Sequence, residues 1–505
     1  MIRLRIVLFF SIVVTIGISA TGQTFSTIFV FDQADGLNPQ GALAQGIDGN
    51  LYGTTIYGGT SGCTGGQPAC GNFYRITPGG LQNSLYSFCL QQPYCSVDGA
   101  YPNAGVVLGT SGYFYGTTYG QDLSYGTVYK ISSKGLLTTL YTFCQLLNCA
   151  DGLYPVAPLT QGSDGNFYGT TISGGTSPYS SDCYNGCGTG YKITPAGTFS
   201  SIYSFCSLPN CLDGDAPTQL IQASDGNFYG TTDLGGTSND GTIFKLTSKG
   251  KLTTIYNFCS QSNCSDGAGA LSGVIQGADG NLYGTTYGGG VYNSGTIFKI
   301  SPTGKFTTLY SFCSQSNCAD GSLPTSPLMQ ATDGNFYGTT SYGGLYDCGL
   351  SQDNYPCGTL FRITPSGIFT VIHSFDGFMG DGGSPNQAGL FQSTNGVIYG
   401  TTFYWVPLDC DGGLGCGAVF SLDIGASPFI RTLPGQGKVG SEVGILGNGL
   451  TSATSVTFKG TKAQFTVRSA TLILTHVPAG ATTGVVEVTL PSGTLTSNVP
   501  FQVIP

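Results

Sequence analysis

The stretch Asp333-Gly-Asn-Phe-Tyr-Gly-Thr-Thr340 contains a tetrapeptide, Tyr-Gly-Thr-Thr, that recurs along the 505-residue chain and decides its fold. The seven copies begin at Tyr52, Tyr115, Tyr168, Tyr229, Tyr283, Tyr337 and Tyr399, with successive spacings of 63, 53, 61, 54, 54 and 62 residues. A period with occasional insertions indicates one supersecondary unit that is copied seven times. Such a unit does not bury its apolar face alone, so we expect its copies to stack on one another.

The sequence around this copy predicts four antiparallel strands. Asp333-Gly334 is typical of a tight hairpin, because both central residues of such a turn accept positive φ. A Gly-rich loop of variable length separates the second and third strands, and Pro365-Ser-Gly367 separates the third and fourth. The predicted strands are 326–332, 336–340, 358–364 and 368–375. Four strands in about 50 residues are the content of one propeller blade.

The apolar pattern of this unit favours sheets that stack face to face. Leu360, Phe361 and Ile363 place apolar groups on both faces of the third strand, as in a sheet that is covered on both sides. Tyr337 and Gly338 must point to opposite faces of the second strand. We expect the tyrosine to fill the gap to one neighbouring blade and the glycine to let the other blade approach closely.

The two ends of the repeat region complement each other. Residues 24–31 match a fourth strand that lacks the three strands before it, whereas the last unit has only its first three strands, at 389–393, 397–402 and 418–422. If the first strand completes the last unit, seven full blades result and the open sheet edges disappear. A β-solenoid is the alternative. The complementary ends favour a closed, all-β, seven-bladed β-propeller.

The 18 cysteines fall into nine local pairs, which occupy two positions in the repeat. One class follows the fourth strand: Cys89/Cys95, Cys144/Cys149, Cys206/Cys211, Cys259/Cys264 and Cys313/Cys318. The other class lies in the loop between the second and third strands: Cys63/Cys70, Cys183/Cys187, Cys348/Cys357 and Cys410/Cys416. This loop has 15, 7, 16, 8, 8, 17 and 14 residues in the seven units, and only the four longest contain cysteines.

Cysteines that are gained in pairs predict disulfides in an exported chain. Zinc is the alternative, but no pair has Cys-x-x-Cys spacing and no histidine lies near a pair. Both cysteine classes should lie on one face of the propeller, with only tight turns on the opposite face. Function in propellers tends to reside on the face with the variable loops.

Composition and the N-terminus indicate export. Only 9% of the residues are charged, against roughly 25% in an average protein, and the net charge is −9. Without a Lys/Arg cluster, nucleic acid is excluded as a partner. Arg3 and Arg5 precede an apolar run at 6–18, which predicts a secretory signal peptide over 1–22 with cleavage after Ala20 or Gly22. An uncleaved anchor is the alternative. No other stretch predicts a membrane span, so the mature chain should be secreted or lie at the cell surface.

A second domain follows the repeats. From about residue 426 the cysteines disappear and short alternating runs appear, at 443–446, 455–458, 464–467, 471–475, 485–490 and 499–503. About 80 residues of this kind predict a small immunoglobulin-like β-sandwich. The expected domains are therefore a signal peptide over 1–22, a propeller over 23–425 and a sandwich over 426–505.

The recurring pattern Asp-Gly-Asn-Phe-Tyr-Gly-Thr-Thr, then Gly-Gly, then Gly-Thr-Ile-Phe-Lys-Ile-Thr resembles the GloVer (Gloeo/Verruco) tandem repeat of bacterial choice-of-anchor surface proteins. Residues 426–505, with Ile445-Leu-Gly-Asn-Gly-Leu450 and Val477-Pro-Ala-Gly-Ala-Thr-Thr-Gly484, resemble an IPT/TIG domain. The resemblance implies export and surface association, and it supplies no catalytic residues. No sorting helix or basic tail is recognisable at the C-terminal end, which leaves free secretion as an alternative to anchoring.

Two groups of residues are candidate binding sites. Each unit carries an Asp-Gly dipeptide before its first strand, at Asp35, Asp98, Asp151, Asp213, Asp266, Asp320 and Asp381. These aspartates either start Asx-type turns or form a ring of carboxylates that could bind calcium near the channel mouth. Tyr404 and Trp405, in the long loop of the last unit, either pack over the closing blade or stack on a ligand such as a sugar.

The sequence gives little support for catalysis. The only histidines are His373 and His476, and neither a Gly-x-Ser-x-Gly motif nor a phosphate-binding loop is present. We predict no catalytic residues and no cofactor. The expected function is that of a monomeric, secreted or surface-bound protein that binds a glycan or protein through its disulfide-braced loop face. An extracellular carbohydrate-active enzyme with Asp/Glu catalysis on the same face is the alternative.

Overall fold

The computed structural model describes residues 23–32, 34–60, 69–90, 95, 97–120, 124–177, 183, 185–346, 357–377, 381–387, 389–403 and 416–504. Within these ranges the chain is all-β, with a few short 3-10 helices. The described residues contain no helix of the length and apolar character that a bilayer crossing requires. The predicted signal peptide over 1–22 lies outside the described residues.

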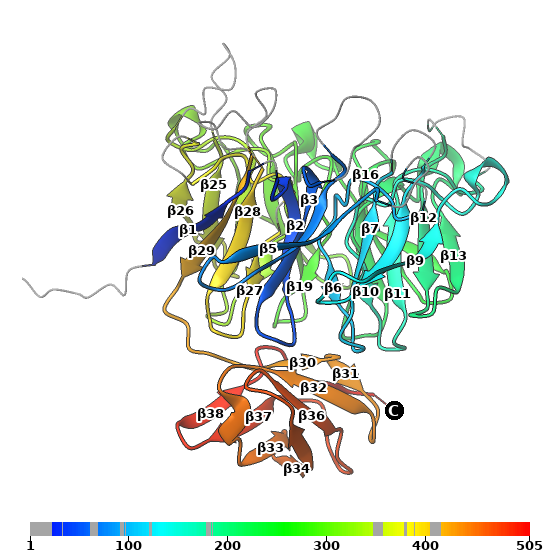
Figure 1. Cartoon of the computed structure of the whole chain (residues 1–505). Coiled ribbons are helices and arrows are strands. Elements are labelled where there is room, and N and C mark those ends of the chain that lie inside the picture. Colours follow the sequence, from blue (N-terminus) through cyan, green and yellow to red (C-terminus); the bar gives the residue numbers. More distant parts are fainter. Residues whose placement is uncertain are drawn as a thin grey trace, which may run out of the picture.

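The repeat region forms seven antiparallel sheets (Figure 1), numbered here in chain order. Sheet 1 contains β2 (Leu37–Gln45), β3 (Leu51–Tyr57), β4 (Asn72–Ile76) and β5 (Gln82–Ser87). Sheet 2 contains β6 (Val107–Leu108), β7 (Phe114–Thr118), β8 (Thr127–Ile131) and β9 (Leu137–Thr142). Sheet 3 contains β10 (Thr160–Gln161), β11 (Phe167–Thr171), β12 (Thr189–Ile193) and β13 (Phe199–Ser204).

Sheet 4 differs from the others because two short strands, β14 (Asp215–Pro217) and β15 (Ile221–Gln222), both pair with β16 (Phe228–Leu234). It is completed by β17 (Thr242–Leu246) and β18 (Leu252–Asn257). Sheet 5 contains β19 (Ile275–Gln276), β20 (Leu282–Thr286), β21 (Thr296–Ile300) and β22 (Phe306–Ser311). Sheet 6 contains β23 (Met329–Gln330), β24 (Phe336–Thr340), β25 (Thr359–Ile363) and β26 (Phe369–Ser374), close to the four strands predicted for this unit.

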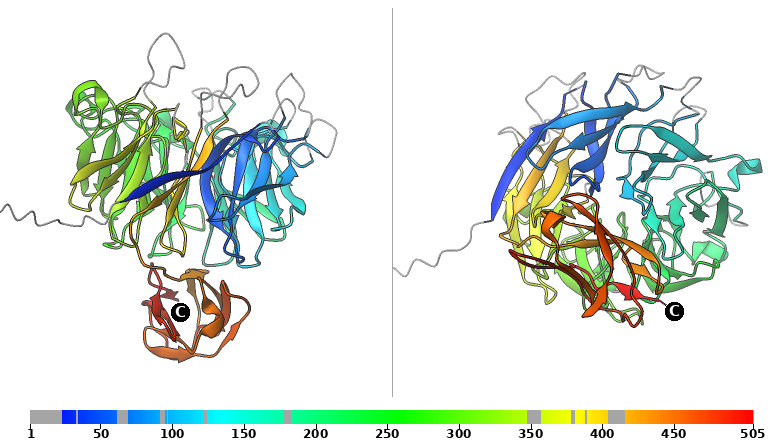
Figure 2. Two further views of the ribbon diagram at one scale, coloured as in Figure 1. Left: turned by 60° about the vertical axis from the view of Figure 1, so that its left-hand side comes forward. Right: turned by 60° about the horizontal axis from the view of Figure 1, so that its bottom comes forward.

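Sheet 7 joins the two ends of the repeat region. Its order is β1 (Thr24–Val30), β29 (Ala418–Asp423), β28 (Ile398–Thr402) and β27 (Phe391–Gln392), with Thr24 opposite Asp423. Sheet 7 also contacts sheet 1: the Gln45 side chain donates to Thr394 Oγ1 at 2.8 Å and accepts from the Thr394 amide at 3.1 Å. The first and last units of the repeat are therefore neighbours in space, as Figure 2 also shows.

The tyrosine of each Tyr-Gly-Thr-Thr copy packs against the next sheet, as the sequence predicted. The Tyr52 ring lies 4.3 Å from that of Phe114, and the Tyr115 ring lies 3.9 Å from that of Phe167. The same contact joins Tyr168 to Phe228 at 4.0 Å and Tyr283 to Phe336 at 4.1 Å. These tyrosines are almost fully buried, so four of the seven copies supply an aromatic contact between consecutive sheets. In the other three copies the tyrosine shares an apolar cluster with an aliphatic residue of the next sheet, at Leu282, Ile398 or Leu51.

The glycine of the motif has a different role from the predicted one. Gly338 is paired with Phe361 in the third strand of its own sheet, and a Cβ added to Gly338 would lie 2.6 Å from Phe361 Cζ. The prediction that this glycine admits a neighbouring blade was therefore wrong. The aromatic ring of the residue paired across the two strands fills the space that this glycine leaves. The same arrangement recurs in all seven copies.

The threonines and a set of glutamines supply polar contacts between sheets. The Thr170 hydroxyl donates to Thr218 O in the next sheet at 2.7 Å, whereas the following Thr171 hydroxyl bonds Thr189 within its own sheet at 2.8 Å. Glutamines at the ends of the first strands accept from the preceding sheet's hairpin, as Gln222 Oε1 does from the Ser163 amide at 2.8 Å. These buried hydrogen bonds fix each sheet relative to its neighbours.

Residues 430–504 form a sandwich of two four-stranded sheets with a shared apolar core. One sheet contains β30 (Arg431–Leu433), β32 (Glu442–Leu446), β36 (Leu472–His476) and β35 (Phe465–Val467). The other contains β34 (Thr461–Ala463), β33 (Ser455–Phe458), β37 (Val486–Leu490) and β38 (Gly493–Thr496). A parallel pair, β31 (Gln436–Gly437) and β39 (Gln502–Val503), completes it. Short β30, β31, β34 and β38 were not predicted.

The sandwich lies against one side of the seven sheets (Figures 1 and 2). We call this the turn side, because it carries the Asp-Gly-Asn hairpins, and the opposite one the loop side. Thr471 Oγ1 donates to Ile47 O at 2.6 Å, and Gln436 Nε2 donates to Gln222 Oε1 at 2.7 Å. Arg431 stacks on Phe391 at 4.4 Å and donates to Gln392 O at 3.0 Å. The sandwich is thus bonded to sheets 1, 4 and 7.

Candidate ligand-binding site

The aspartates that precede the first strands brace turns on the loop side. Asp151 is fully buried and accepts hydrogen bonds from the Tyr141 hydroxyl at 2.7 Å and from the Gln145 and Leu146 amides at 2.9 and 3.1 Å. Each such carboxylate joins the fourth strand to the turn that follows it. The tyrosine contact recurs at Asp98, Asp213, Asp266 and Asp320.

The two remaining aspartates vary this arrangement. Asp381 bonds His373 Nε2 at 2.6 Å in place of a tyrosine. Burial acts to raise the pKa of Asp381, but the hydrogen bonds from His373 and Asp376 outweigh it and lower that pKa. Burial and the nearby Asp32 carboxylate raise the pKa of Asp35. None of the potential metal-binding clusters in the described part of the chain includes any of the seven aspartates. Their hydrogen bonds favour the turn interpretation over a calcium ring.

Disulfides brace the same side of the molecule. The structure joins six of the predicted pairs: Cys89–Cys95, Cys144–Cys149, Cys183–Cys187, Cys206–Cys211, Cys259–Cys264 and Cys313–Cys318. Four of them include residues of the 3-10 helices η1 (Leu147–Cys149), η3 (Pro209–Cys211), η4 (Ser262–Cys264) and η5 (Ser316–Cys318). Cys70, Cys357 and Cys416 are also disulfide-bonded, and their predicted partners Cys63, Cys348 and Cys410 lie outside the described residues.

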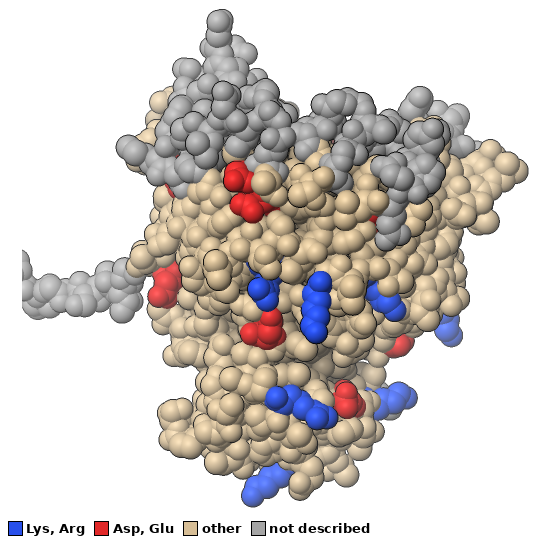
Figure 3. Space-filling model, viewed as in Figure 1, with Lys and Arg blue, Asp and Glu red and all other residues tan. Residues whose placement is uncertain are grey.

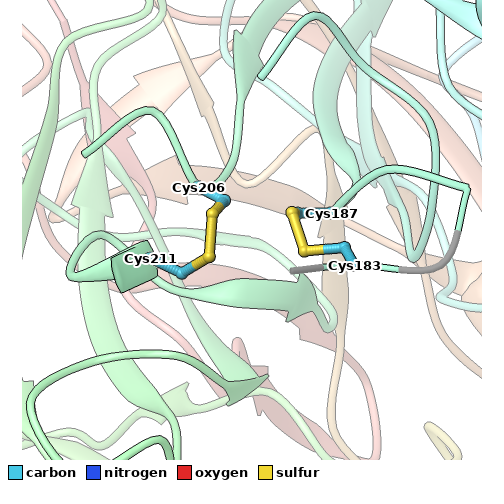
Figure 4. A group of neighbouring side chains, drawn as sticks. All are labelled: Cys183, Cys187, Cys206 and Cys211. Atoms are coloured by element: carbon cyan, nitrogen blue, oxygen red, sulfur yellow. A yellow bond between two sulfur atoms is a disulfide. The ribbon is translucent and has the colours of Figure 1, made fainter. Parts of the chain in front are cut away.

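Where one unit has both cysteine classes, the two disulfides lie side by side. In sheet 3 the sulfur atoms of Cys183, Cys187, Cys206 and Cys211 all lie within 4.8 Å of one another (Figure 4). In sheet 1 the Cys70 and Cys95 sulfur atoms are 3.9 Å apart. The disulfide of the long loop therefore packs on the disulfide of the fourth-strand turn, which holds the loop against the sheet.

A ring of left-handed residues marks the loop-side entrance of the space between the sheets. The third residue after each turn aspartate has positive φ: Asn38 (55°), Tyr101 (58°), Tyr154 (61°), Ala216 (52°), Gly269 (62°), Leu323 (52°) and Ser384 (46°). Each amide donates to a carbonyl of the preceding sheet, as Tyr154 N does to Tyr125 O at 2.9 Å. Positive φ is an unfavourable backbone conformation for residues other than glycine, and this hydrogen bond stabilises it in each unit. The side chain at this position therefore varies from unit to unit while the backbone conformation is kept.

Aromatic side chains gather on one part of this entrance. Tyr57, Tyr101, Tyr119, Tyr154 and Phe403 line a cavity of 540 Å³ between sheets 1, 2, 3 and 7, which we call the aromatic pocket. The rings of Tyr119 and Tyr154 are stacked with centroids 4.6 Å apart, and those of Tyr57 and Tyr101 meet edge to face at 5.3 Å. The predicted aromatic pair, Tyr404 and Trp405, follows Phe403 and lies outside the described residues.

The polar lining of the aromatic pocket is neutral. Gln40, Asn103, Ser124 and Gln387 contribute to it, and no charged side chain is among the described lining residues. Ser124 is 2% exposed, and its hydroxyl has no hydrogen-bond partner among the described residues, nor has Asn103 Oδ1. A buried polar atom without a partner costs about 1–3 kcal/mol.

A second cavity, of 860 Å³, lies between the seven sheets and the sandwich, and we call it the channel. It extends from Ala216 at the loop-side entrance to Asn498 and Gln502 of the sandwich on the turn side. Asn103 and Gln387 line both the channel and the aromatic pocket, so the two cavities are adjacent. Charged side chains are also sparse on the surface of the molecule that Figure 3 shows.

Two acidic residues of sheet 4 stand at this entrance. Asp233, at the end of β16, is the only charged residue among the described residues that line the channel. Burial raises the pKa of Asp233. Burial, followed by the charge of Asp233, raises the pKa of the neighbouring Asp215 to about 6.

This acidic pair was not predicted from the sequence, although a comparison of the seven copies reveals it. Sheet 4 is the one unit with an acid at both positions. The residue two after the turn aspartate is Leu37, Ala100, Leu153, Asp215, Ala268, Ser322 or Gly383. The residue after Tyr-Gly-Thr-Thr is Ile56, Tyr119, Ile172, Asp233, Tyr287, Ser341 or Phe403.

The copied sheets and the terminal sandwich define a tandem-repeat β-protein with a second, immunoglobulin-like domain. The family described as the Gloeobacter/Verrucomicrobia repeat matches residues 14–208 and 179–420, and the IPT/TIG domain matches residues 428–503. The chain therefore belongs to the Gloeobacter/Verrucomicrobia repeat family, with a C-terminal IPT/TIG domain. Both resemblances stated from the sequence are confirmed. No curated protein matches the chain.

The comparison with solved structures gives matches of low identity and low TM-score. The extracellular domain of a hybrid two-component system from B. thetaiotaomicron has 11% identity and a TM-score of 0.47, over 94% of this chain and 58% of that one. This chain thus spans little more than half of that protein. The PQQ-bound aldose sugar dehydrogenase of Streptomyces coelicolor has 13% identity and a TM-score of 0.38, over 79% of this chain and 98% of that one.

Proposed function

We propose that the protein is an exported binding protein that holds a glycan in the aromatic pocket of its loop side. The observation that carries this proposal is the composition of that pocket. Tyrosine rings offer flat apolar faces for sugar rings, and neutral amides and hydroxyls suit sugar hydroxyl groups. Ser124 and Asn103 belong to this neutral polar lining.

The proposal includes the architecture that forms the pocket. The seven sheets are the blades of a closed propeller over 23–425, the sandwich spans 426–505, and residues 1–22 are a signal peptide. The pairing of β1 with β29 and the hydrogen bonds between Gln45 and Thr394 support closure. The disulfides support an oxidising compartment, outside the cell or at its surface. We propose that the protein is a monomer there.

A glycan array on the mature protein tests this function, with Tyr154→Ala as the site variant. Loss of one stacking ring should weaken binding about 10- to 100-fold, since such residues contribute about 1–3 kcal/mol. The matched control is Tyr292→Ala, which removes an exposed tyrosine outside the pocket and should leave binding unchanged. Absence of any glycan binding, or equal binding by the Tyr154 variant, contradicts the proposal.

The acidic pair favours one alternative, an extracellular carbohydrate-active enzyme. A carboxyl group with a pKa of about 6, such as Asp215, keeps part of its protons near neutral pH and can act as a general acid beside a carboxylate. A hydrolysis screen over the glycans that bind distinguishes the two functions. Turnover that Asp215→Asn abolishes, with binding intact, would establish the enzyme. Binding without turnover establishes the binding protein.

A further inference from the structure

We propose that the glycan bound in the aromatic pocket carries a free primary amine, as a 2-amino-2-deoxy sugar does, and that Asp233 binds the ammonium group. This inference rests on the proposed glycan function and assigns the substrate class of that same site. It makes Asp233 the specificity-determining residue of the protein.

The distribution of charge is the first argument. The aromatic pocket and the channel are adjacent and share Asn103 and Gln387, and Asp233, in the channel, is the only charged residue among all the described residues that line the two cavities. A carboxylate in a partly buried, neutral surrounding attracts a cation more strongly than one in water. The lining therefore selects for a ligand that is neutral over most of its length and positive at one place.

The lack of a partner for this carboxylate is the second argument. The Asp233 carboxylate has no hydrogen bond or ion pair with any described residue. In contrast, Asp164, Asp225 and Asp279 on the turn side each bind a lysine, at 2.9, 2.8 and 2.7 Å. Burying a charge without a partner costs free energy. An ammonium group from a ligand would supply the missing partner.

The position of Asp233 within the repeat is the third argument. Asp233 follows Tyr-Gly-Thr-Thr in sheet 4, as Tyr119 does in sheet 2. Tyr154 belongs to sheet 3, between them, and its carbonyl accepts from the amide of Ile172, which occupies the equivalent position in sheet 3 and lines the channel. If one sugar ring stacks on Tyr119 and Tyr154, the next sugar of the oligosaccharide would thus extend along the entrance toward Asp233. The buried, unpartnered Ser124 hydroxyl lies on the tyrosine side of the same path.

A bound metal ion fits this place less well than an ammonium group. Calcium takes 6–8 oxygen ligands, and the carboxylates of Asp215 and Asp233 offer at most four oxygens. Among the described residues, neither aspartate is part of a potential metal-binding cluster. A single ammonium group needs only one or two carboxylate oxygens and can hydrogen-bond with them directly.

Calorimetric titration of the mature full-length protein at about pH 7 tests the inference with three β-1,4-linked trisaccharides. They are the trimers of glucosamine, N-acetylglucosamine and glucose, which differ only in an amine, an acetamide or a hydroxyl. We expect the wild type to bind the amine trimer at least about 10-fold more tightly than the other two. Asp233→Asn should abolish this preference and leave the affinities for the two neutral trimers within about 2-fold.

The matched control is Asp32→Asn, which removes the same charge from an exposed residue and should keep the full preference. Equal wild-type affinities for the three trimers, or a preference that persists in Asp233→Asn, would overturn the inference while the glycan function stands. Binding of CaCl2 that is lost in Asp233→Asn would also overturn it, in favour of a metal site. Failure of every trimer to bind would overturn this inference, whereas the glycan function itself fails only if no glycan on the array binds.

Discussion

The acidic residues at the two ends of strand β16 differ in their hydrogen-bond partners and in their pKa. At the turn-side end, Asp225 accepts from Lys245 at 2.8 Å, from the Tyr229 hydroxyl at 2.8 Å and from the Asn227 amide at 3.0 Å. Burial acts to raise the pKa of Asp225, but these bonds outweigh it and lower that pKa to about 2. At the loop-side end, Asp233 has no such partners, and burial raises its pKa.

This difference distinguishes Asp225, which stabilises the fold, from Asp233, which we propose binds the ligand. The Asp-Tyr contact of the turn side also occurs in sheets 1, 3, 5 and 6, with every acceptor satisfied by the chain itself. The acids of the loop-side end occur only in sheet 4, and no described residue bonds or pairs with Asp233. A carboxylate that recurs with the same partners in several units stabilises the fold, whereas Asp233, present in one unit, is the group that we propose binds the ligand.

The largest effect is expected between the two ends of β16, at Gly230. A Cβ at this position would lie 2.8 Å from Phe244 Cζ, in a sheet that is covered on both faces. Gly230→Ala should therefore lower the free energy of unfolding by about 3 kcal/mol, as overpacking does. Urea unfolding gives this value. Gly435→Ala, where a Cβ meets nothing within 4 Å, is the control and should change stability little. An unchanged stability of Gly230→Ala would show that the ring of Phe244 moves freely.

The two acids should respond oppositely to removal of their charge. Asp225→Asn loses the charge-assisted bonds of an exposed cluster and should lower the free energy of unfolding by about 1 kcal/mol at neutral pH. Asp233→Asn removes a partly buried charge without a partner, so it should leave stability unchanged or raise it. Thermal unfolding of both variants under one condition measures the contrast. A clear destabilisation by Asp233→Asn would contradict the view that this carboxylate has no partner in the chain.

The stability of the protein should also depend on pH in opposite ways through Asp225 and Asp215, with a smaller effect than the substitutions above. The pKa of Asp225 is depressed on folding, so its contribution is present above pH 4 and is lost as the pH falls toward 2. The pKa of Asp215 is raised to about 6 on folding, so its ionisation costs stability above pH 6 and the cost disappears near pH 4. Asp215→Asn should therefore raise Tm at pH 8 and leave Tm unchanged at pH 4. A stabilisation that is equal at the two pH values would contradict the raised pKa.

Much of the fold could be predicted because the copies repeat their local signals. The hairpin at Asp333-Gly334 and the strand at 336–340 follow from patterns within one unit, and the pairing of residues 24–31 with the last unit follows from the complementary ends of the repeat region. The role of Gly338 could not be predicted in this way. Strand alternation shows that it faces away from Tyr337, but only the pairing register shows that Phe361 fills the space it leaves.

The candidate site was largely beyond prediction. The sequence drew attention to the seven turn aspartates, six of which the structure buries in hydrogen bonds of their own turns, as at Asp151 and Asp213. It gave no reason to group Tyr57 with Tyr154 or Phe403, because these residues come from different copies at different positions of the repeat. Their proximity depends on how the sheets are arranged around the channel.

The sequence by itself determined the repeated unit, the strands within it, the positions of the disulfides and the domain at the C-terminal end. These features depend on contacts between residues that are close along the chain, where spacing and residue type are sufficient. The tertiary structure alone decided which side chains share the aromatic pocket and that Asp233 lines the channel without a partner among the described residues. Such features depend on burial and on contacts between copies, which arise only when the sheets pack against one another.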